Sequence, residues 1–328
     1  MSLEQALNRN DHAELSTSRQ PRGAQHALRS PGLRKHRRTK SRRKLIAWLF
    51  MLPLVVFNVV VILGPSLATA YYAFTDWTGQ GPANWVGLAN FQQLFVDNDF
   101  HQALLHNIIW MALFLTIPMA VGLLIAVTLS QITRFQLFFR SLFFLPYVMA
   151  TVVNAAIWQN LLNPSVGIST GLDQIGIHWL DNVYFLGNEH LALPTVAFVD
   201  MWHFTGFLVV LFLAAIQAVD PELYSAARVD GANRLRQFWH ITLPGIRPTL
   251  MFLTLMTTIW SFFTFEYVYI LTGGGPAGST DVLSTLLFRN ALNNNLAGYA
   301  TAQALVMALG GAVVAFGVAI MRKRGWEV

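Results

Sequence analysis

Residues 191–219 read LALPTVAFVDMWHFTGFLVVLFLAAIQAV, a stretch whose ionisable side chains are Asp200 and His203. A helix of about 20 apolar residues crosses the roughly 30 Å hydrocarbon layer of a bilayer. Within that layer every backbone amide must find its hydrogen-bond partner inside the helix. The stretch therefore predicts a transmembrane helix, and the regions on both sides of it repeat the pattern.

Five further apolar stretches are long enough to cross a bilayer. They cover residues 45–74, 103–130, 142–161, 249–271 and 297–321. In the third of them, Asn154 and Gln159 interrupt the run and Pro146 lies near its start. Hydrophobic residues make up 54% of the chain and charged residues 12%, whereas soluble domains hold about 45–50% apolar residues. We therefore expect an all-α polytopic membrane protein with about six transmembrane helices.

Residues 1–44 form a polar, basic segment ahead of the first apolar stretch. They hold 12 of the 22 Lys and Arg residues and lack aromatic residues, so they cannot bury enough surface to offset the entropy of folding. We predict a disordered cytoplasmic tail that orients the chain and attracts anionic lipid. The alternative is an arm that binds a regulator or nucleic acid, although we expect no nucleic-acid partner. The next stretch is too long for a signal peptide and lacks a cleavage site, so we expect it to remain as the first span.

The remaining basic residues predict the orientation of the spans. Short loops rich in Lys and Arg stay in the cytoplasm. Basic residues follow the second, fourth and sixth apolar stretches, at Arg134 and Arg140, at Arg228, Arg234, Arg236 and Arg247, and at Arg322, Lys323 and Arg324. The opposite side carries Arg289 as its one basic residue, among several Asp and Glu residues. This alternation predicts a multi-pass protein of the plasma or inner membrane with both termini in the cytoplasm.

The loop between the fourth and fifth stretches, residues 220–248, reads DPELYSAARVDGANRLRQFWHITLPGIRP. Asp220 is a helix-capping residue and Pro221 suits a first helical turn, which predicts a short helix. Gly231 provides a turn, and Pro244 is expected to end a second short helix. The pattern is equally compatible with an amphipathic helix lying in the lipid headgroups, with Trp239 at the interface.

The same loop resembles the EAA loop of binding-protein-dependent ABC importer permeases. The resemblance rests on Ser225-Ala-Ala-Arg-Val-Asp-Gly231, then nine residues, then Ile241-Thr-Leu-Pro244. In that family the loop is a helix-turn-helix that docks into a groove of the ATPase subunit. The implied ATPase-coupling residues are Ser225, Ala226, Ala227, Asp230, Gly231, Ile241, Leu243 and Pro244. Ser225 stands where the family usually has glutamate, so a salt bridge made by that glutamate has no counterpart here.

Further motifs are similar to the carbohydrate-type branch of this family, the maltose and glycerol-phosphate permeases. They are residues 85–91 (WVGLANF), 140–146 (RSLFFLP), 230–232 (DGA) and 271–276 (LTGGGP). The resemblance covers residues 45–328 and implies a permease domain. It implies as partners a second permease subunit, two ATP-binding subunits and an extracytoplasmic solute-binding protein that delivers a monosaccharide or oligosaccharide.

The chain itself carries no phosphate-binding Gly-x-x-x-x-Gly-Lys-Ser/Thr motif. ATP and Mg²⁺ would therefore bind to the partner subunits, and we expect no cofactor and no enzymatic activity in this chain. The absence of cysteine excludes disulfides, Cys-ligated zinc, iron–sulfur clusters and thiol catalysis. ATP-driven closure of the partner subunits would move the docked loop as a rigid body, together with the fourth and fifth spans.

Two polar and aromatic stripes within the spans are candidates for the substrate path. They consist of Asp200, His203, Phe204 and Phe207 on the fourth span, and Thr257, Trp260, Ser261 and Thr264 on the fifth. Sugars present hydroxyl groups and apolar CH faces, which polar groups and aromatic rings recognise. Ordinary helix packing, with Ser and Thr bonding across helices, explains the same stripes.

Asp200 and Glu266 are charged groups within the predicted spans, where a charge at the bilayer centre costs about 2.5–3.5 kcal/mol on insertion scales. We expect both to face the protein interior, either along the path or as packing groups, with His203 as a partner for Asp200. A proton-coupled secondary transporter that uses both carboxylates is the alternative function. No metal site is expected, because zinc needs three or four ligands. An anionic substrate such as glycerol phosphate would favour a basic group in a span, and the spans contain none, which favours a neutral sugar.

Overall fold

The computed structural model describes residues 48–132, 134–179 and 183–323. These residues are mainly helical, and Thr75 and Trp85 form an isolated antiparallel bridge. The chain divides into two compact units, Met1–Val59 and Val60–Val328. In the first unit the described residues, 48–59, are helical. The predicted tail, residues 1–44, lies outside the described residues.

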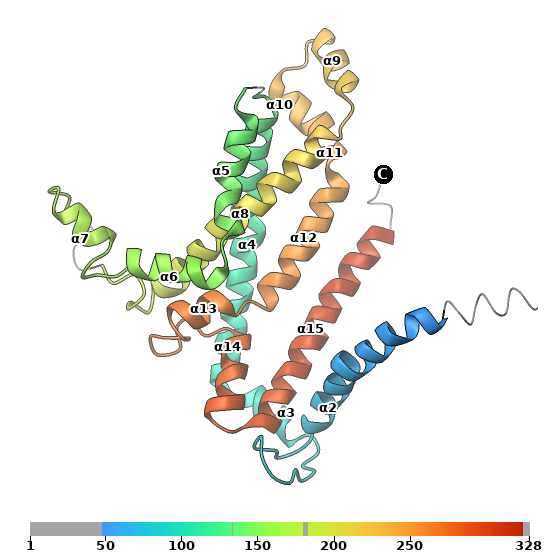
Figure 1. Ribbon diagram of the computed structural model, residues 1–328, viewed down its shortest axis with the longest axis vertical. Coiled ribbons are helices and arrows are strands. Elements are labelled where there is room, and N and C mark those ends of the chain that lie inside the picture. Colours follow the sequence, from blue (N-terminus) through green and yellow to red (C-terminus); the bar gives the residue numbers. More distant parts are fainter. Residues whose placement is uncertain (1–47, 133, 180–182, 324–328) are drawn as a thin grey trace, which may run out of the picture. The chain divides into compact units, whose positions relative to one another are not determined.

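Five helical segments in the described part of the chain are long and apolar enough to cross a membrane (Figure 1). They are Trp48–Tyr72, which ends in η1 (Val59–Leu63) and α2 (Gly64–Tyr72), α4 (Asn98–Ser130), α8 (Ala192–Gln217), Arg247–Leu271, and the Ala297–Val314 part of α15 (Ala297–Lys323). A bent pair of helices makes a sixth if it is counted as one span. The prediction of about six transmembrane helices is confirmed.

The third predicted span is not one straight helix over residues 142–161. The structure has α5 (Gln136–Val148) and α6 (Thr151–Leu161), bent by 92° to each other. Met149 and Ala150 are extended between them, with ψ of 141° and 137°. Pro146 lacks an amide hydrogen and so weakens the last turn of α5. A third short helix, α7 (Ile168–Asp173), follows.

The fifth span is interrupted as well. It consists of α12 (Arg247–Phe262) and α13 (Glu266–Leu271), and residues 263–265 between them leave the helix. Neither Gly nor Pro occurs at this break, so its cause lies in tertiary contacts rather than in local sequence. The break puts Thr264 and Glu266 close to other spans.

Helix α8 is the most buried span and packs against α4 and α5. Close approach depends on Gly206, because a Cβ there would overlap the carbonyl oxygen of Phe143. Trp110, Leu208 and Phe212 are fully buried at this contact. The result is a tightly packed core around one face of α8, which positions the polar stripe of that helix.

A second cluster of buried residues lies at the opposite end of α4 from α5 (Figure 1). It joins α4 and α15 to two short elements, α3 (Ala89–Val96) and α14 (Leu283–Phe288), and η3 (Arg289–Asn293) contacts α14 and α15 nearby. Arg289 forms an ion pair with the buried carboxylate of Asp281. This pair explains the one basic residue that departs from the charge pattern of the predicted outer loops.

The loop at residues 220–248 forms two helical parts, as predicted. The first is α9 (Pro221–Val229), capped by Asp220, whose side chain accepts from the Glu222 amide at 2.9 Å. Gly231 makes the turn with a φ of +79°. The second part runs through α10 (Arg234–Gln237), the π-helical segment η2 (Phe238–Thr242) and α11 (Leu243–Gly245).

The predicted stop at Pro244 is wrong. Pro244 lies in α11, which follows η2 without a gap, so the helical run continues past the proline to Gly245. Only Ile246 then separates α11 from α12. The second half of the loop is therefore almost continuous with the fifth span.

Candidate functional site

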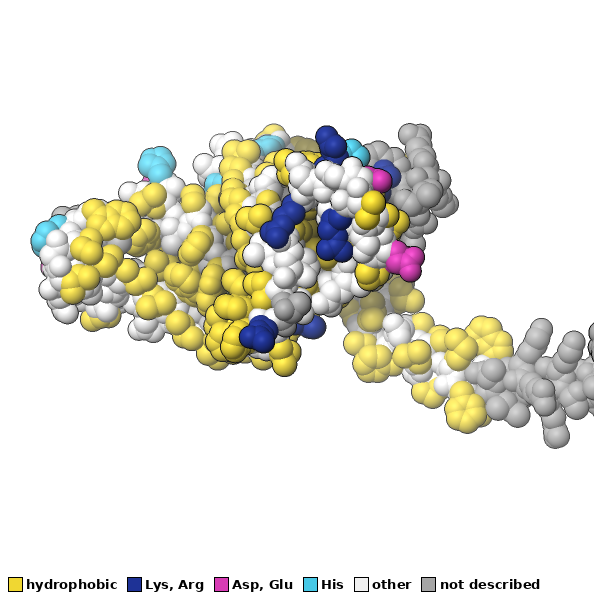
Figure 2. Space-filling view, turned by 90° about the horizontal axis from the view of Figure 1, so that it is seen from above, with side chains coloured by type: hydrophobic (Ala, Val, Ile, Leu, Met, Phe, Trp, Pro, Cys, Tyr) yellow, Lys and Arg dark blue, Asp and Glu magenta, His cyan; other side chains and the backbone are white. Residues whose placement is uncertain are grey.

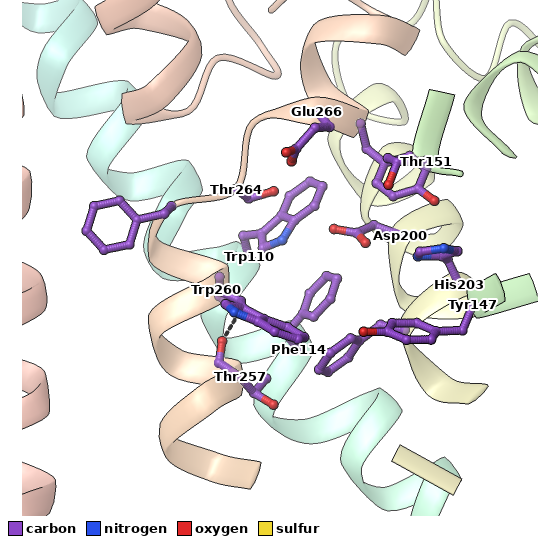
Figure 3. Close-up of a pocket in the computed structure, with 14 residues that line it drawn as sticks. Trp110, Phe114, Tyr147, Thr151, Asp200, His203, Thr257, Trp260, Thr264 and Glu266 are labelled. Atoms are coloured by element: carbon purple, nitrogen blue, oxygen red, sulfur yellow. Dashed lines mark hydrogen bonds between the residues drawn. The ribbon is translucent and has the colours of Figure 1, made fainter. Parts of the chain in front are cut away.

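A cavity of about 390 Å³ lies where α4, α5, α8, α12 and α13 meet (Figure 3). Its volume is at the lower end of the range of ligand pockets, about 300–1,000 Å³. The two predicted stripes converge on it. The predicted residues that line it are Asp200, His203, Phe204, Thr257, Trp260, Ser261, Thr264 and Glu266. Phe207 lies behind this lining, with its ring 5.0 Å from that of Tyr147 and 5.7 Å from that of Trp260.

Sequence reasoning missed about half of the lining. The additional residues are Trp110, Phe114, Tyr147, Thr151, Phe263 and Tyr267. Trp110 and Phe114 are four residues apart on α4, a helix so apolar on all sides that no face stands out. Tyr147 and Thr151 flank the bend between α5 and α6 and reach the cavity only because of that bend.

Aromatic rings form a continuous wall around the cavity. The rings of Phe204 and Trp260 meet edge to face at 5.3 Å, and those of Trp110 and Phe114 stack at 5.5 Å. Phe114 also lies 5.9 Å from Phe204, which connects the two pairs. Such a surface offers apolar faces that the CH face of a sugar ring can contact.

The cavity also holds polar atoms without protein partners. Trp110 Nε1 and the Tyr267 hydroxyl are buried and have no hydrogen-bond partner among the residues that the structure describes. On the other side, the carboxylates of Asp200 and Glu266 approach the cavity from α8 and from the start of α13 (Figure 3). The site therefore combines two carboxyl groups with an unsatisfied donor and an unsatisfied hydroxyl buried beside them, groups of the kind that bind a ligand rich in hydroxyl groups.

His203 does not bond to Asp200 in the described structure. Its Nε2 lies 3.3 Å from the carbonyl oxygen of Met149, one of the two extended residues between α5 and α6. Among the described residues, no group of three or more His, Asp or Glu side chains is arranged to hold a metal ion. Asp200 therefore lines the cavity without forming an ion pair with His203.

The 220–248 loop is held together as one unit. The hydroxyl groups of Tyr224 in α9 and Thr242 in η2 lie 3.0 Å apart and share a hydrogen bond. At the base of the loop, a Cβ on Gly245 would lie only 2.8 Å from a methyl group of Val219. The two ends of the loop are therefore in contact with each other, and a hydrogen bond joins its two helical parts.

The outer surface of the loop is open. Among the predicted coupling residues, Ser225, Ala226, Asp230, Gly231 and Pro244 are exposed, and Ala227, Ile241 and Leu243 are half-buried. The space around Gly231 is empty. Figure 2, which views the molecule from the α9 end, shows Lys and Arg side chains gathered on this face. Three of its small residues, Ser225, Ala226 and Gly231, therefore face outward, whereas Ala227 is partly covered.

Comparisons with known proteins agree with this architecture. Residues 119–325 match the family model described as "Binding-protein-dependent transport system inner membrane component". The chain is 34% identical to the probable ABC transporter permease protein YurN of Bacillus subtilis, over 81% of this chain and 92% of that one. It is 36% identical to the diacetylchitobiose uptake system permease protein NgcF of Streptomyces coelicolor, over 78% and 76% of the two chains.

The fold is also similar to a solved structure. One chain of a bacterial alginate ABC transporter, in complex with its alginate pentasaccharide-bound periplasmic protein, superposes with a TM-score of 0.79 at 25% identity. The match covers 88% of this chain and 98% of that chain. The likeness therefore extends through nearly the whole of the described helical structure.

Proposed function

Because the chain belongs to the family of binding-protein-dependent transport system inner membrane components, we propose that it carries a neutral sugar through the cavity beside α8. It is a multi-pass permease subunit of an importer and not itself an enzyme. A second permease subunit would complete the path, and an extracytoplasmic binding protein would deliver the sugar. Two ATP-binding subunits would power the cycle.

The observation that supports a sugar is the combination of an aromatic wall with unpartnered polar groups. Trp110 Nε1 and the Tyr267 hydroxyl are buried without partners in the described part of the chain, and leaving such a group unpaired costs about 1–3 kcal/mol. A sugar hydroxyl that enters the cavity would satisfy them while its ring contacts Trp260. Named relatives take up diacetylchitobiose and alginate, so glycans are the substrates to test first.

Charge favours a neutral glycan over an anionic one. The described residues that line the cavity include the acidic residues Asp200 and Glu266 but no Lys or Arg. A carboxylate or phosphate group would lie beside two acidic side chains, with no basic group to balance its charge in a medium of low dielectric constant, which is unfavourable. Alginate, an acidic polysaccharide, and glycerol phosphate are accordingly poor candidates.

The loop at residues 220–248 would dock on an ATP-binding subunit. Its small, exposed residues permit close approach, and its nearly continuous connection to α12 would transmit a displacement to the cavity. The basic residues near α5 and in this loop, Arg134, Arg140, Arg228, Arg234 and Arg236, favour a cytoplasmic location for this end. Both termini would then lie in the cytoplasm.

The test is uptake into vesicles that contain the complete transporter. The chain is co-expressed with its neighbouring permease, ATP-binding and solute-binding subunits, and the vesicles are offered labelled diacetylchitobiose, maltose, cellobiose and glycerol 3-phosphate. We expect uptake of a neutral sugar that requires internal ATP and survives a protonophore. Uptake abolished by the protonophore but independent of ATP would instead support a proton-coupled carrier.

A further inference from the structure

The break between α12 and α13 is closed by a side chain from a different span. In a continuous helix the carbonyl groups of Ser261 and Phe262 would accept from the amides of residues 265 and 266. The chain leaves the helix at residue 263, so these carbonyl groups lose their helical partners. The Nδ2 group of Asn107, on α4, donates to both, at 3.2 Å and 3.0 Å.

The oxygen atom of the same Asn107 side chain binds the end of a second helix. Asn107 Oδ1 accepts from the backbone amide of Leu283, the first residue of α14, at 2.7 Å. An amide at this position also lacks a partner within its own helix. One buried side chain, 1% exposed, therefore satisfies three backbone groups that belong to two helix ends.

We propose that Asn107 is a positioning residue for the substrate cavity, and this inference rests on the proposed function of that cavity. By donating to the last carbonyl groups of α12, it stabilises a break at residues 263–265 in the buried interior, where unpaired backbone groups are costly. The break turns Thr264 and Glu266 into the cavity lining. Asn107 also precedes Trp110 by one helical turn on α4, so it fixes two walls of the cavity relative to each other.

The structure supplies a matched control on another helix. Asn90, on α3, also donates its amide to two backbone carbonyl groups, those of Ala73 and Thr75, at 2.9 Å and 2.8 Å. It is 9% exposed and lines no part of the cavity. Replacing Asn90 removes the same type of interaction but leaves the break between α12 and α13 intact. It therefore shows how the loss of two such hydrogen bonds elsewhere in the fold affects the measurements.

The experiment uses the natural absence of cysteine in this chain. Thr264→Cys places a single thiol of this subunit in the break, and its rate of reaction with N-ethylmaleimide is measured in the assembled transporter. Asn107→Leu removes all three bonds. Asn107→Asp keeps the oxygen that accepts from Leu283 and loses the amide that donates to the two carbonyl groups. Asn90→Leu is the control.

We expect both Asn107 variants to speed labelling of the thiol by at least about tenfold, equivalent to about 1.4 kcal/mol, whereas Asn90→Leu leaves the rate within about twofold. In the chain with Thr264 intact, both Asn107 variants should raise the KM of the imported sugar more than they lower the maximal rate. Equal labelling rates in all backgrounds, or an equal rise for the Asn90 control, would overturn the inference. The labelling result does not depend on whether the cargo is a sugar, so failure of the proposed function is recognised separately.

Discussion

The hydroxyl groups of Tyr224 and Thr242 lie 3.0 Å apart although 18 residues separate them in the sequence. Their hydrogen bond joins α9 to η2, and Thr242 is 6% exposed. Since η2 continues through α11 into α12, this bond connects the outermost helix of the loop to a helix that lines the cavity.

Tyr224→Phe and Thr242→Val should each uncouple transport from ATP hydrolysis. Either change breaks the shared bond, which contributes about 0.5–1.5 kcal/mol, and lets α9 move without η2. We expect several-fold less sugar imported per ATP hydrolysed, measured in vesicles that contain the complete transporter. The double variant should behave like the single ones, because the bond is lost only once. Additive losses would show that the two hydroxyl groups act separately.

Ala227→Asp should abolish uptake while the subunit still inserts and assembles. Ala227 is half-buried beside the exposed Ala226 on α9, the helix that would dock, where a charged side chain would hold the ATP-binding subunit away. Loss of uptake together with normal co-purification of the second permease is the expected result. Normal uptake by this variant would contradict the assignment of the loop.

Ser225→Glu provides the matched variant on the same helix. The Ser225 hydroxyl lies 3.1 Å from an Nη atom of Arg228 and is exposed. A glutamate there would pair with this arginine one turn further along α9, a contact that contributes about 0.2–0.5 kcal/mol. We expect uptake at or above the level of the unmodified protein. A loss as large as that of Ala227→Asp would mean that any charge on α9 is harmful.

Trp260→Ala should weaken sugar binding. The indole of Trp260 contacts Phe204 and Phe207 in the aromatic wall, and removing it leaves the CH face of a sugar without a platform. We expect KM to rise by about tenfold, which corresponds to about 1.4 kcal/mol. Phe252→Leu is the control, because Phe252 lies on the same helix but is 52% exposed and does not line the cavity. An unchanged KM for Trp260→Ala would remove this residue from the path.

The pattern of apolar runs predicts most of the spans, because burial in lipid demands long uninterrupted helices. The polar stripes on α8 and α12 likewise predict most of the cavity, since a polar group within a span must face the interior. Helical spacing alone was enough to place Phe204 and Trp260 on the faces that meet in the structure. The capping signals of Asp220 and Pro221 also predict the start of α9 correctly.

The geometry of the two interrupted spans could not be predicted, and the break at residues 263–265 has a tertiary cause. Residues 263–265 contain no helix-breaking residue, and the break depends on an amide from Asn107, more than 150 positions away in the sequence. The bend after α5 brings Tyr147 and Thr151 to the cavity, although Pro146 alone indicates only a weakened helix. Trp110 was missed because α4 is apolar on every side and thus shows no preferred face.

Arg289→Met should destabilise the protein through Asp281. The Asp281 carboxylate is 4% exposed and is bound by Arg289 and by the hydroxyl of Thr285. Removing one partner of a buried ion pair costs about 3–5 kcal/mol, because the remaining charge is left buried without compensation. We expect a lower midpoint of thermal unfolding for the purified transporter near neutral pH. Arg236→Met, at an exposed position of α10, is the matched change and should have little effect.

The size of this loss should depend on pH in a defined direction. Burial raises the pKa of the Asp281 carboxyl above its usual value, and the hydrogen bond and charge of Arg289 oppose that rise. A carboxyl whose pKa is higher in the folded than in the unfolded state stabilises the fold when protonated, and that stability is lost as the pH rises through the folded pKa. Without Arg289 the pKa rises further, so the difference between Arg289→Met and the unmodified protein should shrink as the pH falls from about 7.5 to about 5. A difference that grows on acidification would mean that Asp281 is not the group left unpaired.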